Sequence, residues 1–201
     1  MKRILHLKSS VQGDASYSVK LGNAIVEKIQ HKYAGSTVEE LNLAEMDIPH
    51  LDPDKIRTLF TPRELLSAHD MEANRLSDEL IERLFAADFI VIGAPLINFT
   101  IPSPLKAWID LIARPKITFS YSQEGQPIGL VKGKKVYVAM SSGGVYSEGP
   151  GKDFDFVAPY LKAFLAFLGM TDLEVYRAEG LKVPGIMENA MEKAVASIDI
   201  D

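Results

Sequence analysis

The sequence predicts an α/β fold built on an open parallel sheet with helices on both faces. Short apolar runs typical of buried strands alternate along the chain with longer segments of helical periodicity. The run from Phe89 to Ala94 is continuously apolar, as expected for a parallel strand covered on both faces. No repeat, low-complexity tract or linker interrupts the alternation. We therefore expect residues 1–201 to form a single domain.

The first half of the chain is expected to contain two strands and two helices. A strand from Arg3 to Leu7 leads into an amphipathic helix from Ser16 to about Tyr33, in which apolar residues fall at helical spacing. The segment from Thr37 to Leu43 is a second strand, polar enough to lie at a sheet edge. After a loop around residues 48–53, a long polar helix is predicted from about Pro62, a favourable first helical residue, to Ala87.

The second half repeats the alternation and adds an excursion of hairpin type. The segments Ile117–Tyr121 and Ile128–Val131 flank the turn-forming run Gln123–Pro127, which predicts a hairpin. With these elements the chain would have five strands in its main sheet and about five helices. The other expected elements, in chain order, are a strand at Phe89–Ala94, a helix at Pro104–Ile112, a strand at Lys135–Met140, a strongly apolar helix at Phe154–Leu168, a strand at Leu173–Ala178 and a closing helix at Ile186–Ile198.

Composition excludes several classes of function. The net charge is −5 and no long basic run occurs, which argues against non-specific nucleic-acid binding. The chain has no cysteine, so thiolate nucleophiles, disulfides and Cys-ligated metals are excluded. The four histidines are scattered without metal-ligand spacing, and we expect no metal site. No targeting segment or membrane-length apolar run is visible, which favours the cytoplasm.

A candidate ligand loop follows the buried strand at Phe89–Ala94. There Pro95 ends the strand, and Leu96, Ile97, Asn98 and Phe99 come before the next helix. Ligands of open α/β sheets bind just beyond the carboxyl ends of the strands. An amide side chain beside backbone N–H groups, with a flat apolar ring next to it, suits a planar heteroaromatic ligand such as a flavin.

Serines crowd the loop between the first strand and the first helix. Ser9, Ser10, Gly13, Ser16 and Ser18 lie where a helix N-terminus presents unpaired N–H groups and the positive end of its dipole. Such a site favours a phosphate monoester. The alternative is ordinary N-capping by Ser16 or Ser18.

The phosphate loop matches neither standard nucleotide motif. The chain contains no Gly-x-Gly-x-x-Gly at this loop and no Gly-x-x-x-x-Gly-Lys-Ser/Thr anywhere. A dinucleotide bound in the Rossmann manner and a P-loop NTPase are both disfavoured. A mononucleotide such as FMN, with its phosphate in the first loop and its ring over the Asn98–Phe99 loop, fits the pattern better.

A third loop, Ser141 to Gly144, follows the strand at Lys135–Met140. Paired glycines let the backbone approach a ligand closely and direct N–H groups at it. Toward the pyrimidine edge of a flavin, such donors would stabilise the negative charge that appears on reduction. Taken alone, the segment is better interpreted as an ordinary glycine-rich turn, but together with the other two loops it would form the third side of a ligand site.

The residues of these loops match a known family. The chain resembles the FMN-dependent NADH azoreductases, also described as NADH:quinone oxidoreductases, which have a flavodoxin-like five-stranded sheet of order 2-1-3-4-5. Some members were once mislabelled as acyl-carrier-protein phosphodiesterases. The resemblance runs nearly end to end. The matching segments are Leu7-Lys-Ser-Ser10, Ser-Tyr-Ser at 16–18, Ala-Pro-Leu-Ile-Asn-Phe at 94–99, Leu-Lys at 105–106, Thr-Phe-Ser-Tyr at 118–121, Gly-Lys-Lys at 133–135, Ser-Ser-Gly-Gly at 141–144, Gly-Pro at 149–150, Pro-Tyr-Leu at 159–161 and Ala-Glu-Gly at 178–180.

The resemblance implies a cofactor, substrates and an assembly. One FMN-binding domain would span residues 1–201, and two copies would form a homodimer whose substrate pockets use both subunits. NADH or NADPH would supply electrons, and quinones or azo compounds would accept them, in a ping-pong cycle with no named catalytic residue. The implied FMN-binding residues are Ser10, Ser16, Tyr17, Ser18, Leu96, Ile97, Asn98, Phe99, Ser141, Ser142, Gly143 and Gly144, and the implied substrate-side residues are Tyr121, Tyr146 and Phe167.

The chain departs from the best-known members at two positions. Where their glycine loop often carries Arg, this chain has Ser142, and where a histidine often follows the glycines, it has Tyr146. These changes bear on the substrate rather than on flavin binding. An electron carrier of the flavodoxin type is the alternative function. A serine hydrolase is disfavoured because no Gly-x-Ser-x-Gly elbow occurs.

Overall fold

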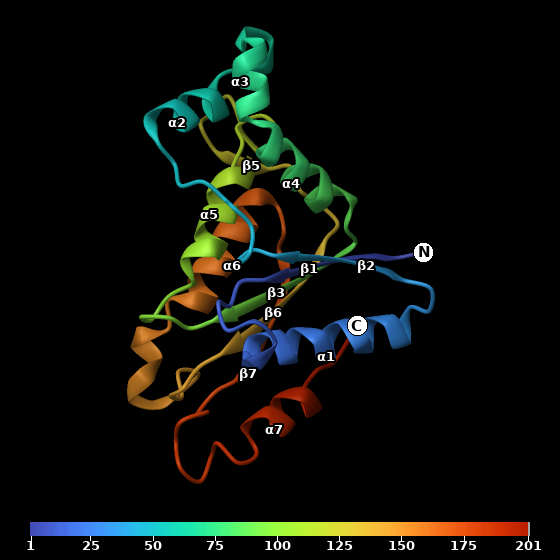
Figure 1. Ribbon diagram of the computed structural model, residues 1–201, viewed down its shortest axis with the longest axis vertical. Coiled ribbons are helices and arrows are strands. Elements are labelled where there is room, and N and C mark those ends of the chain that lie inside the picture. The colour runs from blue at the N-terminus through green and yellow to red at the C-terminus, as the bar shows by residue number, and fades with distance from the viewer. Residues whose placement is uncertain (201) are drawn as a thin grey trace.

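A computed structural model describes residues 1–200 and shows the expected open sheet (Figure 1). Five parallel strands lie in the order β2-β1-β3-β6-β7, which corresponds to the predicted order 2-1-3-4-5. The edge position expected for the second strand is confirmed. The strands are β1 (Arg3–Lys8), β2 (Thr37–Asn42), β3 (Phe89–Pro95), β6 (Lys135–Ser141) and β7 (Asp172–Ala178).

Helices cover both faces of the sheet (Figure 1). On one face, α1 (Tyr17–Lys32) and α7 (Ala190–Ala196) pack over the central strands. The opposite face is covered by α4 (Arg75–Ala86), α5 (Ser103–Ile112) and α6 (Val157–Leu168). The resulting layers explain why β3 is buried along its whole length.

Side chains of β3 divide between two apolar clusters. Ile90 and Ile92 join the larger cluster under α4, α5 and α6, whereas Phe89 and Val91 face α1. This division follows the alternation of side chains along a strand. The fully buried Trp108 of α5 also belongs to the larger cluster.

The prediction of a single long helix from Pro62 to Ala87 is wrong. The segment contains α3 (Ala68–Ala73) and α4, with a 3₁₀ turn at Arg63–Leu65, and α2 (Pro53–Phe60) precedes them. Together α2 and α3 form an arm that extends away from the sheet (Figure 1).

Local capping explains these boundaries. The Asp52 carboxylate accepts a hydrogen bond from the Lys55 N–H (2.6 Å) and starts α2. A reciprocal capping box between Ser67 and Asp70 starts α3. Buried Asn74 lies between α3 and α4, accepting from the Thr58 hydroxyl (2.8 Å) and donating to the Thr58 carbonyl (2.9 Å). These polar side chains form hydrogen bonds with nearby backbone groups and so compete with continuous helix formation. The segment therefore forms shorter helices than predicted.

Two other helices begin later than predicted. The chain forms a 3₁₀ turn at Gly149–Phe154, and α6 then begins at Val157 because the Asp155 carboxylate accepts from the N–H groups of Val157 and Ala158. Ile186 lies in a turn, with its N–H bonded to the Val183 carbonyl, and α7 begins at Ala190.

The predicted hairpin is confirmed, with shorter strands. In a separate two-stranded antiparallel sheet, β4 (Phe119–Tyr121) pairs with β5 (Pro127–Gly129). The Val131 N–H donates to the Leu168 carbonyl (2.9 Å), which ties the hairpin to the end of α6. In residues 1–200 no helix combines the length and the apolar character that crossing a bilayer requires.

Candidate active site

The structure brings the three predicted loops together at the carboxyl edge of the sheet. The Ser9 hydroxyl donates to the Gly93 carbonyl (2.6 Å) and joins the first loop to β3. The Leu96 N–H donates to the Ser141 carbonyl (2.8 Å) and joins the second loop to the third. Parallel strands in register therefore place all three loops at one site, where open α/β sheets bind their ligands.

The serines of the first loop lie at the N-terminus of α1. Ser10, Ser16 and Ser18 are buried, and the hydroxyl oxygens of Ser16 and Ser18 are 3.0 Å apart. Ser16 stands at the N-cap position, yet its side chain makes no capping hydrogen bond in the described residues. The first N–H groups of the helix have no intrahelical acceptor. In the described residues Ser16 therefore does not act as a side-chain cap of α1.

Tyr17, the first residue of α1, does not join the buried serines. Its side chain is half exposed, and the Lys20 ammonium lies 5.3 Å from its ring centroid. Only the backbone of Tyr17 contributes directly to the helix N-terminus.

Gly93 allows α1 to begin close to the sheet. A Cβ atom at this position would lie 3.3 Å from the Leu7 carbonyl oxygen and 3.4 Å from the Ser18 carbonyl oxygen. A larger residue in β3 would push the start of the helix, and its serines, away from the strand ends.

The second loop is a two-residue hairpin. Ile97 and Thr100 exchange both backbone hydrogen bonds (2.9 and 3.0 Å), while Asn98 and Phe99 have φ values of 49° and 69°. Two consecutive left-handed residues are typical of a type I′ turn, which usually contains glycine. The turn presents the Asn98 and Phe99 side chains at the sheet edge, and in residues 1–200 neither backbone N–H donates to the rest of the chain. Leu96, just before the turn, packs on the larger apolar cluster.

Phe99 is part of a small group of aromatic side chains. Its ring centroid lies 5.1 Å from that of Phe154 and 6.4 Å from that of Tyr146, which meets it edge-on. The contact with Phe154 is missing from the sequence-based site. Phe154 begins the apolar run that ends at Leu168, and the periodicity of that run indicates a helix but not a contact with Phe99.

The glycine loop is held by polar contacts on both sides. The Ser142 hydroxyl donates to the Gly144 carbonyl (2.8 Å), and the Glu179 carboxylate accepts from the Tyr146 N–H (2.9 Å). Ser141 is buried at the end of β6. Across residues 1–200, the N–H groups of Gly143 and Gly144 donate to no other part of the chain. These two donors are available to a ligand.

Space around the glycine loop is already filled. A Cβ atom at Gly143 would lie 3.2 Å from the Lys182 side chain, and one at Gly144 would lie 3.2 Å from the Tyr146 ring. Larger residues would therefore displace either the loop or its neighbours.

Tyr121 and Phe167 form a second aromatic cluster. Both rings contact Phe119, at centroid distances of 5.8 Å and 4.6 Å. The Tyr121 side chain is 61% exposed. Within the described residues of one chain, the rings of Tyr121 and Phe167 make no contact with the ring of Phe99. These two predicted site residues therefore lie apart from the three loops.

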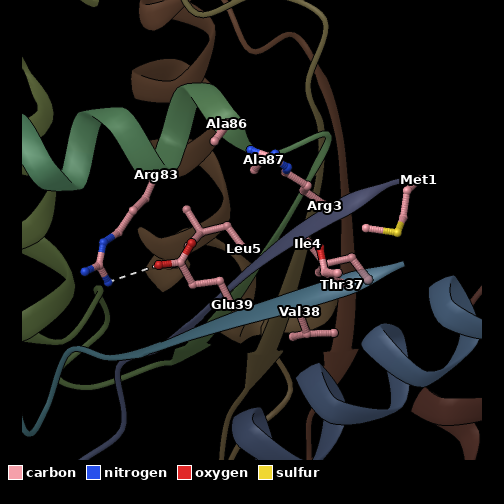
Figure 2. A pocket seen from close by; sticks show the side chains of 10 residues that line it. All are labelled: Met1, Arg3, Ile4, Leu5, Thr37, Val38, Glu39, Arg83, Ala86 and Ala87. Atoms are coloured by element: carbon pink, nitrogen blue, oxygen red, sulfur yellow. Dashed lines mark ion pairs between the residues drawn. The ribbon is translucent and has the colours of Figure 1, made fainter. Parts of the chain in front are cut away.

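A hollow of about 340 Å³ at the opposite end of the sheet has a different character (Figure 2). Arg3 of β1 and Thr37 of β2 line it at the amino ends of their strands. Figure 2 shows Arg83 pointing to Glu39, with which it forms an ion pair at 3.2 Å. Among residues 1–200, no group of His, Asp or Glu side chains is arranged to hold a metal ion.

Comparison with known proteins agrees with the fold. The family described as flavodoxin-like fold matches residues 2–199. The protein is therefore a flavodoxin-like protein.

Curated relatives define the family more closely. An FMN-dependent NADH:quinone oxidoreductase of Agrobacterium fabrum is 44% identical over 199 residues, covering 99% of this chain and 95% of the relative. A protein of the same name from Herminiimonas arsenicoxydans is 44% identical over 181 residues, covering 90% of this chain and 88% of the relative. The chain belongs to the family of FMN-dependent NADH:quinone oxidoreductases, and the resemblance inferred from its sequence is confirmed.

Solved structures agree with this assignment. An azoreductase from Bacillus anthracis str. Sterne is 30% identical and superposes with a TM-score of 0.89, covering 98% of this chain and 96% of that one. An FMN-dependent NADH-azoreductase from Bacillus anthracis str. Ames Ancestor, in complex with FMN, is 28% identical with a TM-score of 0.81, covering 98% and 97%. These relatives are enzymes, which favours an enzyme over an electron carrier.

Proposed function

We propose that the protein is an FMN-dependent oxidoreductase that passes two electrons from NADH to quinones and azo compounds. The observation that carries the proposal is the meeting of three sets of unpaired backbone N–H groups at one sheet edge: the start of α1, the Asn98–Phe99 turn and Gly143–Gly144. Relatives named for this activity support it.

The first loop suits the phosphate of FMN. A terminal phosphate would accept from the first N–H groups of α1 and from the hydroxyls of Ser16 and Ser18, whose oxygens are already 3.0 Å apart. Ser10 and the backbone of Tyr17 would lie along the ribityl chain.

The other two loops suit the isoalloxazine ring. The backbone from Leu96 to Phe99 would run along the ring, with Asn98 near its polar edge. Ser141, Ser142, Gly143 and Gly144 would face the pyrimidine end, where the free N–H groups of the glycines stabilise negative charge.

Bound FMN would supply the two-electron redox chemistry of the reaction. The chain's own residues bind, orient and exclude water. The rings of Phe99 and Phe154, tilted by 37° to each other, would form an aromatic wall against which a nicotinamide or a quinone stacks in turn. No side chain is needed as a nucleophile, and the Tyr146 hydroxyl could donate a proton, as could water.

The substrate side is completed by a second copy of the chain in this proposal. Tyr121 and Phe167 lie apart from Phe99 within one chain, and Tyr121 is largely exposed. A homodimer would bring these two rings of one copy to the aromatic wall formed by Phe99 and Phe154 of the other. We place the enzyme in the cytoplasm, and NADPH is the alternative electron donor.

Steady-state kinetics tests the shared surface. Because one aromatic surface would serve both substrates in turn, double-reciprocal plots at several quinone concentrations should be parallel. Quinones should be reduced faster than azo dyes, since complete cleavage of an azo bond needs two rounds of reduction. Intersecting lines would contradict the shared-surface mechanism.

A further inference from the structure

A hollow of about 370 Å³ lies directly beside the candidate active site. Its walls come from the loop after β6, the first turns of α6 and the end of β7. Three cationic side chains line it, Lys152, Lys162 and Arg177, together with Tyr146 and one carboxylate, Asp155.

The carboxylate in the hollow is already neutralised. Asp155 is buried, and one of its oxygens accepts from the Arg177 guanidinium (2.6 Å). Its other oxygen accepts from the N–H groups at the start of α6. Since the charges of Arg177 and Asp155 cancel, the net positive charge of the residues that line the hollow comes from Lys152 and Lys162.

Lys152 and Lys162 have exposed side chains and form no ion pair within residues 1–200. The nearby Glu179 carboxylate is turned to the N–H groups of Tyr146 and Ser147 and does not line the hollow. Glu148 and Asp153 belong to the same chain segment but lie outside the lining. The charged residues that line the hollow are thus mainly cationic, on a chain whose net charge is −5.

Tyr146 joins the hollow to the aromatic wall. Tyr146 lines the hollow, and its ring meets the Phe99 ring edge-on, with 6.4 Å between centroids. A planar substrate stacked at Phe99 can therefore place a charged substituent beyond Tyr146, close to the two lysines.

We propose that this hollow binds an anionic group carried by a substrate of the reaction. The inference rests on the proposed function and adds a preference for anionic substrates to it. The group could be a sulfonate or carboxylate on the electron acceptor, or a phosphate of the nicotinamide nucleotide, because two ammonium groups in a concave site recognise any of these oxyanions.

The test compares a double variant, Lys152→Gln with Lys162→Gln, with the native chain in its FMN-loaded form. The probes are 1,2-naphthoquinone-4-sulfonate and uncharged 1,2-naphthoquinone, each reduced by NADH at low ionic strength. A matched control variant, Lys132→Gln with Lys193→Gln, removes the same charge from exposed lysines outside the hollow.

Loss of two partly solvated charge contacts should raise the KM for the bound anion about three- to tenfold. If the acceptor's substituent is held, the KM for the sulfonated quinone rises while that for the uncharged quinone does not. If the nucleotide phosphate is held, the KM for NADH rises instead. In either case the control variant stays native, and salt near 0.5 M removes the difference because it screens exposed charges.

Unchanged KM values for all three substrates in the double variant would overturn the inference, as would equal changes in the control variant. Turnover of the uncharged quinone by the native chain separates this failure from failure of the proposed function. Without that turnover, both the proposed function and the inference that rests on it are wrong.

Discussion

The Phe156 N–H donates a hydrogen bond to the carbonyl oxygen of Phe99, with 3.0 Å between nitrogen and oxygen. This bond ties the tip of the Asn98–Phe99 turn to the residue just before α6. Phe156 directly follows Asp155, whose carboxylate caps α6 and pairs with Arg177. The aromatic wall is therefore positioned by a helix start rather than by the turn alone.

Replacing Asp155 by Ala should loosen the aromatic wall and destabilise the fold. The change removes the cap of α6 and leaves the partly buried Arg177 without its partner, which should cost about 2–4 kcal/mol of unfolding free energy. We expect a higher KM for quinones with FMN still bound. Denaturant titration and steady-state kinetics measure both effects, and Asp54→Ala, at an exposed carboxylate, is the matched control. Native stability in Asp155→Ala would show that the contact network does not hold α6.

Replacing Ser16 and Ser18 together by Ala should weaken FMN binding with little effect on the apoprotein. The two buried hydroxyls bond to each other, so removing both leaves no unpaired partner. Loss of two hydrogen bonds to a charged phosphate should raise the FMN dissociation constant on the order of 100-fold. Fluorescence titration of apoprotein with FMN measures it, with Ser36→Ala, beyond the far end of α1, as control. An unchanged dissociation constant for FMN would show that this loop does not bind the phosphate.

Stability should fall in mild acid because of His6. Burial lowers the pKa of this histidine from 6.5 to about 4, with the Lys8 ammonium adding to the shift and Glu40 opposing it. The folded chain thus favours neutral imidazole, while the unfolded chain takes up a proton near pH 6.5. The stabilisation is complete above pH 6.5 and is lost as the pH falls toward 4, by about 2–3 kcal/mol.

Urea unfolding of the native chain and of His6→Gln between pH 8 and pH 4 checks this expectation. The unfolding free energy of His6→Gln should depend less steeply on pH than that of the native chain. His69→Gln, at an exposed position, should keep the native pH dependence. The same pH slope in His6→Gln and the native chain would assign the acid sensitivity to other groups.

Replacing Tyr121 or Phe167 by Ala should change acceptor selectivity while FMN stays bound. The reason is that the proposed dimer brings these rings to the aromatic wall of the second copy. Ratios of kcat/KM for quinones and azo dyes measure the change, and light scattering should show a dimer. A monomer at full activity, or unchanged selectivity in both variants, would contradict the shared site.

Sequence reasoning was strongest where periodicity and burial decide the outcome. The parallel sheet and the meeting of the three loops follow from apolar runs such as Phe89–Ala94 and from parallel topology, whereas the full strand order came with the family resemblance. The prediction of helix boundaries from the sequence failed where a single polar side chain determines where a helix begins or ends. Asn74 and Asp155 set helix boundaries through hydrogen bonds to residues that the periodicity does not reveal. The turn at Asn98 and Phe99 was equally hidden, because neither residue is glycine.

Flavin content and its reduction test the central claim most directly. Purified protein saturated with cofactor should show a flavin spectrum, heat should release FMN rather than FAD at one per chain, and NADH should bleach the spectrum without oxygen. A colourless protein that cannot be reconstituted with FMN, or a bound flavin that no nicotinamide bleaches, would contradict the account.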